Sequence, residues 1–226
     1  GPAELWKDEA GAGIMAALQR GFRPSLMAPA DLAAYKPSER QPLCQPFLVY
    51  SVCMMAPPSF GGVVVLQTLQ MLQARPEGTG TGARFNFDDP EFVHFFAEAG
   101  RLAQADRQKY VGDPDFVRVP AAPLTAAAYV QSRARLIDTT RATKNVEAGQ
   151  VDEKAAQGTS AEPDTETADA TSQLAVVDKD GNALSMTTTI NLNFGSRLMA
   201  NGFVLNNAMT NFATRPVGPN RMQPGK

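Results

Sequence analysis

The stretch "TADATSQLAVVDKDGNALSMTTTINLNFGS", residues 167–196, decides the fold of this chain. At Thr171 it changes from a polar, acidic composition into the alternating pattern of a β-strand. Lys179 to Gly181 interrupt this pattern and fit a short hairpin loop, with Gly181 in the left-handed conformation of a bulge. The sequence therefore predicts an antiparallel hairpin whose first strand begins at Thr171.

This loop also predicts the register of the hairpin. If Asp178 pairs with Asn182, then Val177 lies opposite Ala183 and Thr171 lies opposite Thr189. The register therefore predicts that Thr171 on the first strand faces Thr189 on the second.

The two faces of the predicted hairpin differ in chemistry, because side chains alternate across a strand. One face is apolar and is expected to pack in the core: Leu174, Val176, Leu184, Met186 and Ile190. The other face carries polar side chains: Thr171, Gln173, Ser185, Thr187, Thr189 and Asn191. Simple solvation would also explain this polar face, since threonine is favoured in strands.

The position of Thr171 favours a chemical role for that face. An N-terminal threonine combines a nucleophile and a base, because its Oγ attacks a carbonyl while its own α-amine, with a pKa of about 8, accepts the proton. A peptide bond before Thr171 removes that base, so such an enzyme is made as a precursor and cut between Ala170 and Thr171. Residues 138–170 contain few large apolar side chains, which predicts a flexible acidic linker that ends at this processing site.

The composition of the chain excludes several classes of protein. With 226 residues, 43% of them hydrophobic, and a net charge of −2, the chain can bury a sizeable core but offers no basic surface for nucleic acid. No apolar run approaches the roughly 18 residues of a membrane span, and the first residues lack the features of a signal peptide. We therefore expect no nucleic-acid partner and no membrane span in this chain.

The cysteines and the histidine give little support to a metal site. Cys44 and Cys53 lie nine residues apart without metal-ligand spacing, and between a strand-to-strand disulfide and two buried thiols the thiols are favoured. His94 is the single histidine, which excludes a multi-histidine site, and we expect it to be structural or exposed. These residues therefore predict no metal site.

Most of the remaining chain has helical periodicity. We expect helices within residues 4–22, 63–73, 88–110 and 124–137, with Asp89 and Pro90 starting the third of these. Residues 46–58 form a β-rich run, and the Gly61-Gly62 turn that follows is expected to serve close backbone packing rather than phosphate binding.

Five motifs, in this order, resemble the γ-glutamyltranspeptidase family of N-terminal-nucleophile hydrolases: "DLAAYKPSER", "APPSFGG", "ADRQKYVGDPDFVRVP", "VVDKDGNALSMTTTINLNFGS" and "GFVLNNAMTNF". The resemblance implies an αββα sandwich, here incomplete at both chain ends. It implies self-cleavage into large and small subunits and transfer of a γ-glutamyl group from glutathione-like donors to water or an amine. It implies no metal or organic cofactor. The partners would be a small-molecule substrate and the remaining parts of the chain's own precursor, and the compartment would be periplasmic or extracellular.

The resemblance also implies a domain organisation and roles for single residues. Residues 1–137 correspond to the C-terminal part of the large-subunit region, 138–170 to the linker, and 171–226 to the N-terminal part of the small-subunit region. Thr171 corresponds to the nucleophile and Thr189 to the threonine that supports it. Asn191 corresponds to a residue of the pocket for the donor's α-amino group.

Two departures from the family pattern affect these roles. The family usually has Thr-Thr-His at the cut, whereas this chain has Thr171, Ser172 and Gln173, so slower self-cleavage is expected. Where the family commonly places a glutamine and an acidic residue on the donor's α-ammonium, this chain has Ala208 and Asn211. Asn211 can still offer an amide oxygen to the substrate.

Two alternatives to a γ-glutamyltransferase or hydrolase stay open. A glutaryl or cephalosporin-type acylase of the same family is favoured by the lost ammonium contacts. A noncatalytic fragment or degenerate homologue is favoured because the family's oxyanion segments would lie beyond residue 226. For the same reason the 226-residue chain alone is expected to be inactive.

Overall fold

The computed structural model describes residues 9–20, 23–75, 87–151, 171–213 and 218–223. These residues form helices and three two-stranded antiparallel sheets. The chain divides into two compact units, one made of Gly1–Glu39 with Thr165–Asn211 and the other of Arg40–Asp164 with Phe212–Lys226. No helix in the described ranges combines the length and the apolar character needed to cross a membrane.

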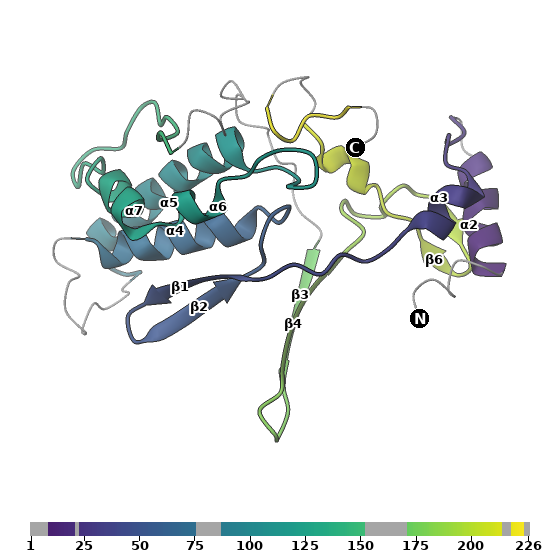
Figure 1. Cartoon of the computed structure of the whole chain (residues 1–226), viewed down its shortest axis with the longest axis horizontal. Coiled ribbons are helices and arrows are strands. Elements are labelled where there is room, and N and C mark those ends of the chain that lie inside the picture. The colour runs from purple at the N-terminus through teal and green to yellow at the C-terminus, as the bar shows by residue number, and fades with distance from the viewer. Residues whose placement is uncertain (1–8, 21–22, 76–86, 152–170, 214–217, 224–226) are drawn as a thin grey trace. The chain divides into compact units, whose positions relative to one another are not determined.

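The second unit is built around three helices that lie side by side, α4 (Gly61–Gln73), α5 (Pro90–Tyr110) and α7 (Ala127–Ala134) (Figure 1). The short helix α6 (Ala121–Leu124) precedes α7. As predicted, α5 begins at Pro90, and the Asp89 side chain caps it by accepting a hydrogen bond from the Glu91 N–H at 3.0 Å. Apolar side chains from all three helices form one buried cluster, which includes Met71, Leu72, Phe92, Phe95, Ala99, Leu102, Val130 and Ala134.

The hairpin of β1 (Leu43–Phe47) and β2 (Tyr50–Met54) packs against α4 in this unit. Cys44 and Cys53 lie directly opposite each other with their Cα atoms 4.1 Å apart, and they form a disulfide. The preference for two buried thiols was therefore wrong, because both residues lie on the exposed face of the hairpin and their pairing brings the sulfurs together. The expectation of close backbone packing is confirmed for Gly62, since a Cβ there would collide with the carbonyl oxygen of Met55, but it is wrong for Gly61, where a Cβ would meet no atom within 4 Å.

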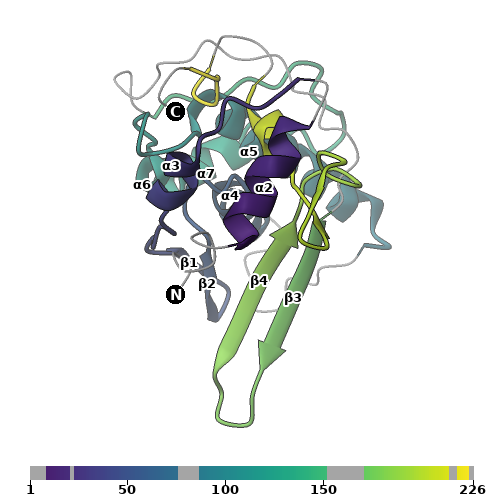
Figure 2. The same ribbon diagram turned by 90° about the vertical axis from the view of Figure 1, so that its right-hand side faces the viewer.

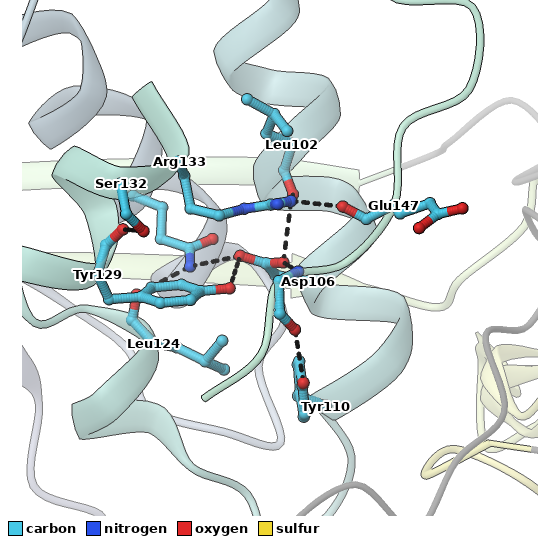
Figure 3. Close-up of polar contacts among 10 residues, drawn as sticks. Leu102, Asp106, Tyr110, Leu124, Tyr129, Ser132, Arg133 and Glu147 are labelled. Atoms are coloured by element: carbon cyan, nitrogen blue, oxygen red, sulfur yellow. Dashed lines mark hydrogen bonds and ion pairs between the residues drawn. The ribbon is translucent and has the colours of Figure 1, made fainter. Parts of the chain in front are cut away.

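A buried carboxylate joins the three helices. Asp106 on α5 is 1% exposed and accepts hydrogen bonds from the Tyr129 hydroxyl at 2.7 Å and from Gln67 Nε2 at 3.1 Å. Arg133 on α7 forms an ion pair with it at 3.2 Å, and Figure 3 shows Tyr129 and Arg133 both directed at this carboxylate. Burial, followed by the Coulombic effect of Asp106, raises the pKa of Tyr129 well above its usual value.

The same carboxylate binds the start of the segment predicted as a linker. The Gly149 N–H donates to Asp106 at 2.8 Å, and the Gly149 carbonyl accepts from the Tyr110 hydroxyl at 2.6 Å. Arg133 donates to the Glu147 carbonyl at 2.7 Å (Figure 3). Residues 138–151 are thus hydrogen-bonded to the helices, while the flexibility predicted for 152–170 and the processing site at Ala170 lie outside the described residues.

Of the two alternatives expected for His94, structural or exposed, the structure shows a structural contact. Its Nε2 lies 2.8 Å from the carbonyl oxygen of Asp138, and its side chain is only partly exposed. The histidine thereby contributes a further contact between α5 and the beginning of the 138–151 segment.

The first unit contains α2 (Glu9–Gln19) and α3 (Pro29–Ala34), the hairpin of β3 (Thr171–Val177) and β4 (Ala183–Thr189), and the short strands β5 (Met199–Ala200) and β6 (Phe203–Val204). A single turn of 3₁₀ helix, η1 (Ala208–Asn211), follows. Ile14, Ala17 and Ala200 form a small buried cluster, and Asn201 Nδ2 donates to the Ala10 carbonyl at 2.8 Å. These contacts attach the β5–β6 turn to α2.

Figure 2 shows β3 and β4 as two neighbouring antiparallel strands, and their residues pair in the predicted register along the whole hairpin. Asp178 N–H donates to the Asn182 carbonyl at 3.0 Å, Gly181 has a φ of 84°, and Thr171 pairs with Thr189. The expectation of a left-handed glycine in the loop is therefore confirmed.

The predicted burial of the apolar face of this hairpin is not found in the described structure. Leu174, Val176, Leu184, Met186 and Ile190 are 37–50% exposed. Both strands are exposed at every residue, and the buried cluster of their own unit, Ile14, Ala17 and Ala200, contains no residue of the hairpin. Alternation correctly predicted which side chains share a face, but a shared face is buried only where another layer covers it.

Candidate active site

The pair Thr171 and Thr189 forms the centre of the candidate active site. Thr171 is the first residue of β3 and Thr189 the last residue of β4, so the antiparallel ladder places them side by side. The Thr171 Oγ1–H donates to Thr189 Oγ1 at 3.1 Å. Both side chains are exposed, so the nucleophile predicted from the sequence is accessible in the described structure.

Thr189 also receives a hydrogen bond from the predicted substrate-binding residue. The backbone N–H of Asn191 donates to Thr189 Oγ1 at 2.8 Å. Asn191 has a φ of 76°, a left-handed conformation that asparagine tolerates better than most residues, and it turns the chain immediately after the strand. The threonine oxygen therefore joins the first residue of β3 to the turn that follows β4.

The side chain of Asn191 continues this connection to η1. Its Nδ2 donates to Thr210 Oγ1 at 2.6 Å and lies 3.5 Å from the Asn207 carbonyl oxygen. The Thr210 hydroxyl in turn donates to the Asn207 carbonyl at 2.9 Å. We call these five residues, Thr171, Thr189, Asn191, Thr210 and Asn207, the hydroxyl–amide chain.

Asn207 also holds the turn itself in place. Its Oδ1 accepts from the Leu192 N–H at 3.0 Å, and its own N–H donates to the Ile190 carbonyl at 3.2 Å. Asn207, which precedes η1, is thus hydrogen-bonded to the residues immediately before and after Asn191. Because this geometry is fixed by local hydrogen bonds, the Asn191 side chain has a defined direction.

Asn211 and Ala208 stand at opposite ends of η1. Asn211 is exposed, and the Ala208 N–H donates to Asn206 Oδ1 at 2.9 Å, which fixes the start of the turn. Thr210, one residue before Asn211, connects this element to Asn191. The role of Asn211 in binding a substrate stays a prediction.

A second set of polar contacts lies next to the threonine pair on the same face. Gln173 Nε2 donates to Ser185 Oγ at 2.8 Å, and the Thr187 hydroxyl donates to Gln173 Oε1 at 2.6 Å. This glutamine therefore bridges β3 and β4 one same-face position along from Thr171. It helps to keep the two strands in the register that pairs Thr171 with Thr189.

The hydroxyl–amide chain carries no formal charge. It offers hydroxyl groups for attack and for proton transfer and amide oxygens as acceptors, which suits acyl transfer. In the ranges that the structure describes, no group of three or more His, Cys, Asp or Glu side chains is arranged to hold a metal ion.

Sequence reasoning did not assign a role to Thr210 or Asn207. Both lie in the "NNAMTNF" segment that was recognised as a motif, but the strand pattern gives no information on which of its side chains reach Asn191. Their spacing from Asn191, 19 and 16 residues, follows from the path of the chain through β5 and β6.

Comparison with known proteins identifies the family. The γ-glutamyltranspeptidase family profile matches residues 1–226. The chain is 36% identical over 222 residues to the glutathione hydrolase proenzyme of Escherichia coli K12, covering 97% of this chain and 35% of that protein. It is 35% identical over 203 residues to the acylase ACY 1 proenzyme of Pseudomonas sp. SE83, covering 89% of this chain and 33% of that protein.

The structure agrees with this relationship. It superposes on the crystal structure of Helicobacter pylori γ-glutamyltranspeptidase with a TM-score of 0.60 and 27% identity, covering 68% of this chain and 43% of that one. The matched fold is thus that of a part of an N-terminal-nucleophile hydrolase. The chain belongs to the γ-glutamyltranspeptidase family, and it spans about 35% of the length of the glutathione hydrolase proenzyme.

Proposed function

We propose that the full-length protein is a γ-glutamyltransferase or hydrolase that cleaves the γ-glutamyl amide bond of glutathione-like donors. The observation that carries this proposal is the 3.1 Å hydrogen bond between Thr171 and Thr189 at the point where the family's small subunit begins. The whole protein would have the αββα sandwich of N-terminal-nucleophile hydrolases, with the remaining parts of the precursor completing the layers. The catalytic chemistry requires no cofactor.

The proposed reaction begins after cleavage between Ala170 and Thr171. The new α-amine of Thr171 accepts the proton of its own hydroxyl, and Oγ attacks the carbonyl carbon of the γ-amide. The amide nitrogen takes the proton and leaves as a free amine, which produces an ester between the γ-glutamyl group and Thr171. Water or an acceptor amine then attacks the ester, and the α-amine again handles the transferred proton.

Thr189 acts in this scheme as the positioning residue of the nucleophile. Its hydroxyl fixes the rotamer of Thr171, while the Asn191 N–H fixes Thr189 in turn. An oriented nucleophile loses less entropy on reaching the transition state. Asn191 and Asn211 would bind the α-amino group of the donor.

A second candidate function is a glutaryl or cephalosporin-type acylase. The family's glutamine and acidic residue would favour an α-ammonium, but this chain has Ala208 and Asn211 in their places. A buried cation without a compensating partner is strongly disfavoured. The relationship to the acylase ACY 1 proenzyme supports this candidate as well. A noncatalytic homologue is the remaining possibility, and an activity assay separates all three.

The decisive experiment measures hydrolysis of γ-glutamyl and glutaryl p-nitroanilides by the full-length protein, side by side. A γ-glutamyltransferase or hydrolase releases nitroaniline from the first donor, and a transferase in addition transfers the γ-glutamyl group to an added dipeptide. An acylase prefers the second donor. If neither donor is cleaved by a protein that has been cut before Thr171, the proposed catalytic function is wrong.

The proposed compartment is the periplasm or the extracellular space. The disulfide between Cys44 and Cys53 supports it, because such bonds persist mainly in oxidising environments. Cell fractionation with detection of the native protein tests this part of the proposal, and recovery in the cytosolic fraction would contradict it.

A further inference from the structure

Thr210 is a residue to which the family resemblance assigns no role, yet it makes the shortest hydrogen bond of the hydroxyl–amide chain. Its Oγ1 lies 2.6 Å from Asn191 Nδ2 and 2.9 Å from the Asn207 carbonyl oxygen. A hydroxyl group has one proton and can accept hydrogen bonds with its lone pairs. The directions of these two bonds are therefore linked.

The Asn207 carbonyl determines both directions. A carbonyl oxygen only accepts, so the single Thr210 proton is directed at Asn207, and Thr210 Oγ1 is left to accept from Asn191. The group of Asn191 that faces Thr210 must then be its NH₂. The 3.5 Å approach of Nδ2 to the Asn207 carbonyl requires the same orientation.

The opposite orientation of the Asn191 amide is disfavoured. It would direct Oδ1 at the Thr210 oxygen, whose proton is already used, and toward a second oxygen on Asn207. Oxygen atoms without a proton between them repel each other, and a donor would be lost as well. The hydrogen bonds of the protein therefore settle which end of this amide faces outward, although the two ends have nearly the same shape.

The end of Asn191 that remains is an acceptor. Its backbone N–H is bound to Thr189 and its NH₂ to Thr210, and within the described part of the chain no donor is hydrogen-bonded to Oδ1. An acceptor in this position suits a substrate group that carries protons, such as an α-ammonium. It does not suit a group that only accepts.

We infer that Thr210 is a positioning residue for donor specificity, which holds the Asn191 amide so that Oδ1 faces the α-ammonium of a γ-glutamyl donor. This inference rests on the proposed function, in which Asn191 lines the donor pocket. With Ala208 and Asn211 in place of the family's usual ammonium contacts, the orientation of Asn191 supplies the preference for an ammonium-bearing donor. Without the Thr210 hydroxyl, the amide can rotate and present NH₂, which repels a cation.

The test compares Thr210→Val with Thr210→Ser in the full-length, processed enzyme. Valine keeps the branched shape and removes the hydroxyl, whereas serine keeps the hydroxyl and removes the methyl group. The quantity measured is the ratio of kcat/KM for the γ-glutamyl p-nitroanilide to that for the glutaryl p-nitroanilide. We expect Thr210→Val to lower this ratio by roughly tenfold, as for the loss of one hydrogen bond to a charged group, and Thr210→Ser to retain it.

A second measurement separates positioning from general damage. The change in Thr210→Val should fall mainly on KM for the γ-glutamyl donor, and inhibition by L-glutamate should weaken relative to inhibition by glutarate. If Thr210→Val changes both donors equally, or if valine and serine give the same ratio, the inference is wrong. Should Thr210→Val remain uncut, Thr210→Ala and Thr210→Ser make the same comparison. If the wild-type enzyme is inactive on both donors, the proposed function is wrong and this inference falls with it. If the wild type is active but Thr210→Val leaves the donor ratio unchanged, only this inference is wrong.

Discussion

Thr171 and Thr189 lie opposite each other at the open end of an antiparallel hairpin, with their Oγ1 atoms 3.1 Å apart. The contact joins residues 18 positions apart, and it depends on every pair between them keeping its register. A slip by one residue would turn one of the two hydroxyl groups to the other face. The polar bridge made by Gln173 and the loop at Asp178 both oppose such a slip.

The first prediction concerns the processing of the precursor. Thr171→Ala should leave one uncut chain, whereas the wild type should be cut between Ala170 and Thr171, because only that cut frees an α-amine beside the hydroxyl group. Intact-mass spectrometry of the full-length protein measures the products. Thr188→Ala, on the other face of β4, is the matched control and should be cut normally. Identical subunits from Thr171→Ala would exclude Thr171 as the nucleophile.

The second prediction concerns support of the nucleophile by Thr189. Thr189→Val preserves the β-branched shape and deletes the hydroxyl, so the protein should fold while kcat falls. The expected loss is about 1 kcal/mol for one hydrogen bond, or roughly fivefold in rate. Thr188→Val makes the same chemical change on the opposite face and should leave kcat near the wild-type value. Equal turnover in Thr189→Val and wild type would mean that the polar face is merely solvated.

The third prediction concerns the charge of the donor pocket. Asn191 and Asn211 supply amide groups without charge, so the wild-type enzyme should distinguish γ-glutamyl from glutaryl donors only modestly. Asn211→Asp adds an anion and should shift kcat/KM toward the γ-glutamyl donor, whereas Asn193→Asp, which adds the same charge outside η1, should not. A strong wild-type preference that Asn211→Asp leaves unchanged would place the ammonium contact elsewhere and remove the acylase alternative.

The fourth prediction concerns the buried ion pair between Asp106 and Arg133. Arg133→Met leaves Asp106 charged without its cation and removes a donor from the Glu147 carbonyl, so the protein should lose about 3 kcal/mol of unfolding free energy. Arg135→Met, at an exposed position just after α7, is the control and should change stability little. Urea unfolding at neutral pH measures both. Equal midpoints for the two variants would show that the ion pair contributes nothing to stability.

The fifth prediction concerns acid and the hairpin loop. Hydrogen bonds from the Asn182 side chain and backbone, and then from backbone groups of the loop, lower the pKa of Asp178. A group with a lowered pKa contributes stability that is fully present above its ordinary pKa of about 4 and is lost as the pH falls through the lowered value.

The stability difference between wild type and Asp178→Asn should therefore be constant above about pH 5 and shrink at lower pH. Urea unfolding at several pH values measures this difference. Asp180→Asn, which removes a loop carboxylate that contacts Lys179 rather than the loop amides, is measured alongside as the matched substitution. A difference for Asp178→Asn that grows in acid would contradict the prediction.

Local sequence signals predicted the part of the site that depends on one hairpin. Asp180 and Gly181 fixed the loop, the loop fixed the register, and the register placed Thr171 against Thr189. The start of α5 at Pro90 followed in the same way from its capping residue. In each case the contacts form between residues close in sequence, so pattern and geometry are sufficient.

The features that were not predicted depend on contacts that the local sequence pattern does not indicate. The turn between Cys44 and Cys53 contains Leu48 with a φ of 55°, a conformation that its sequence does not suggest, so the cross-strand disulfide was not favoured. The contact of Asp106 with Arg133 arises from helix packing. The burial expected for Leu174 and its neighbours failed because a strand pattern identifies an apolar face without identifying what covers it.

Thr189 Oγ1 accepts hydrogen bonds from both the Thr171 hydroxyl and the Asn191 N–H. One oxygen atom is therefore shared between the residue proposed to attack the substrate and the residue expected to select it. Free-energy changes from substitutions on the two sides of this atom should not add, because residues in one hydrogen-bond network are thermodynamically coupled. During divergence within such a family, a change of preferred donor could thus alter turnover, and each new specificity would have to be accompanied by readjustment around the nucleophile.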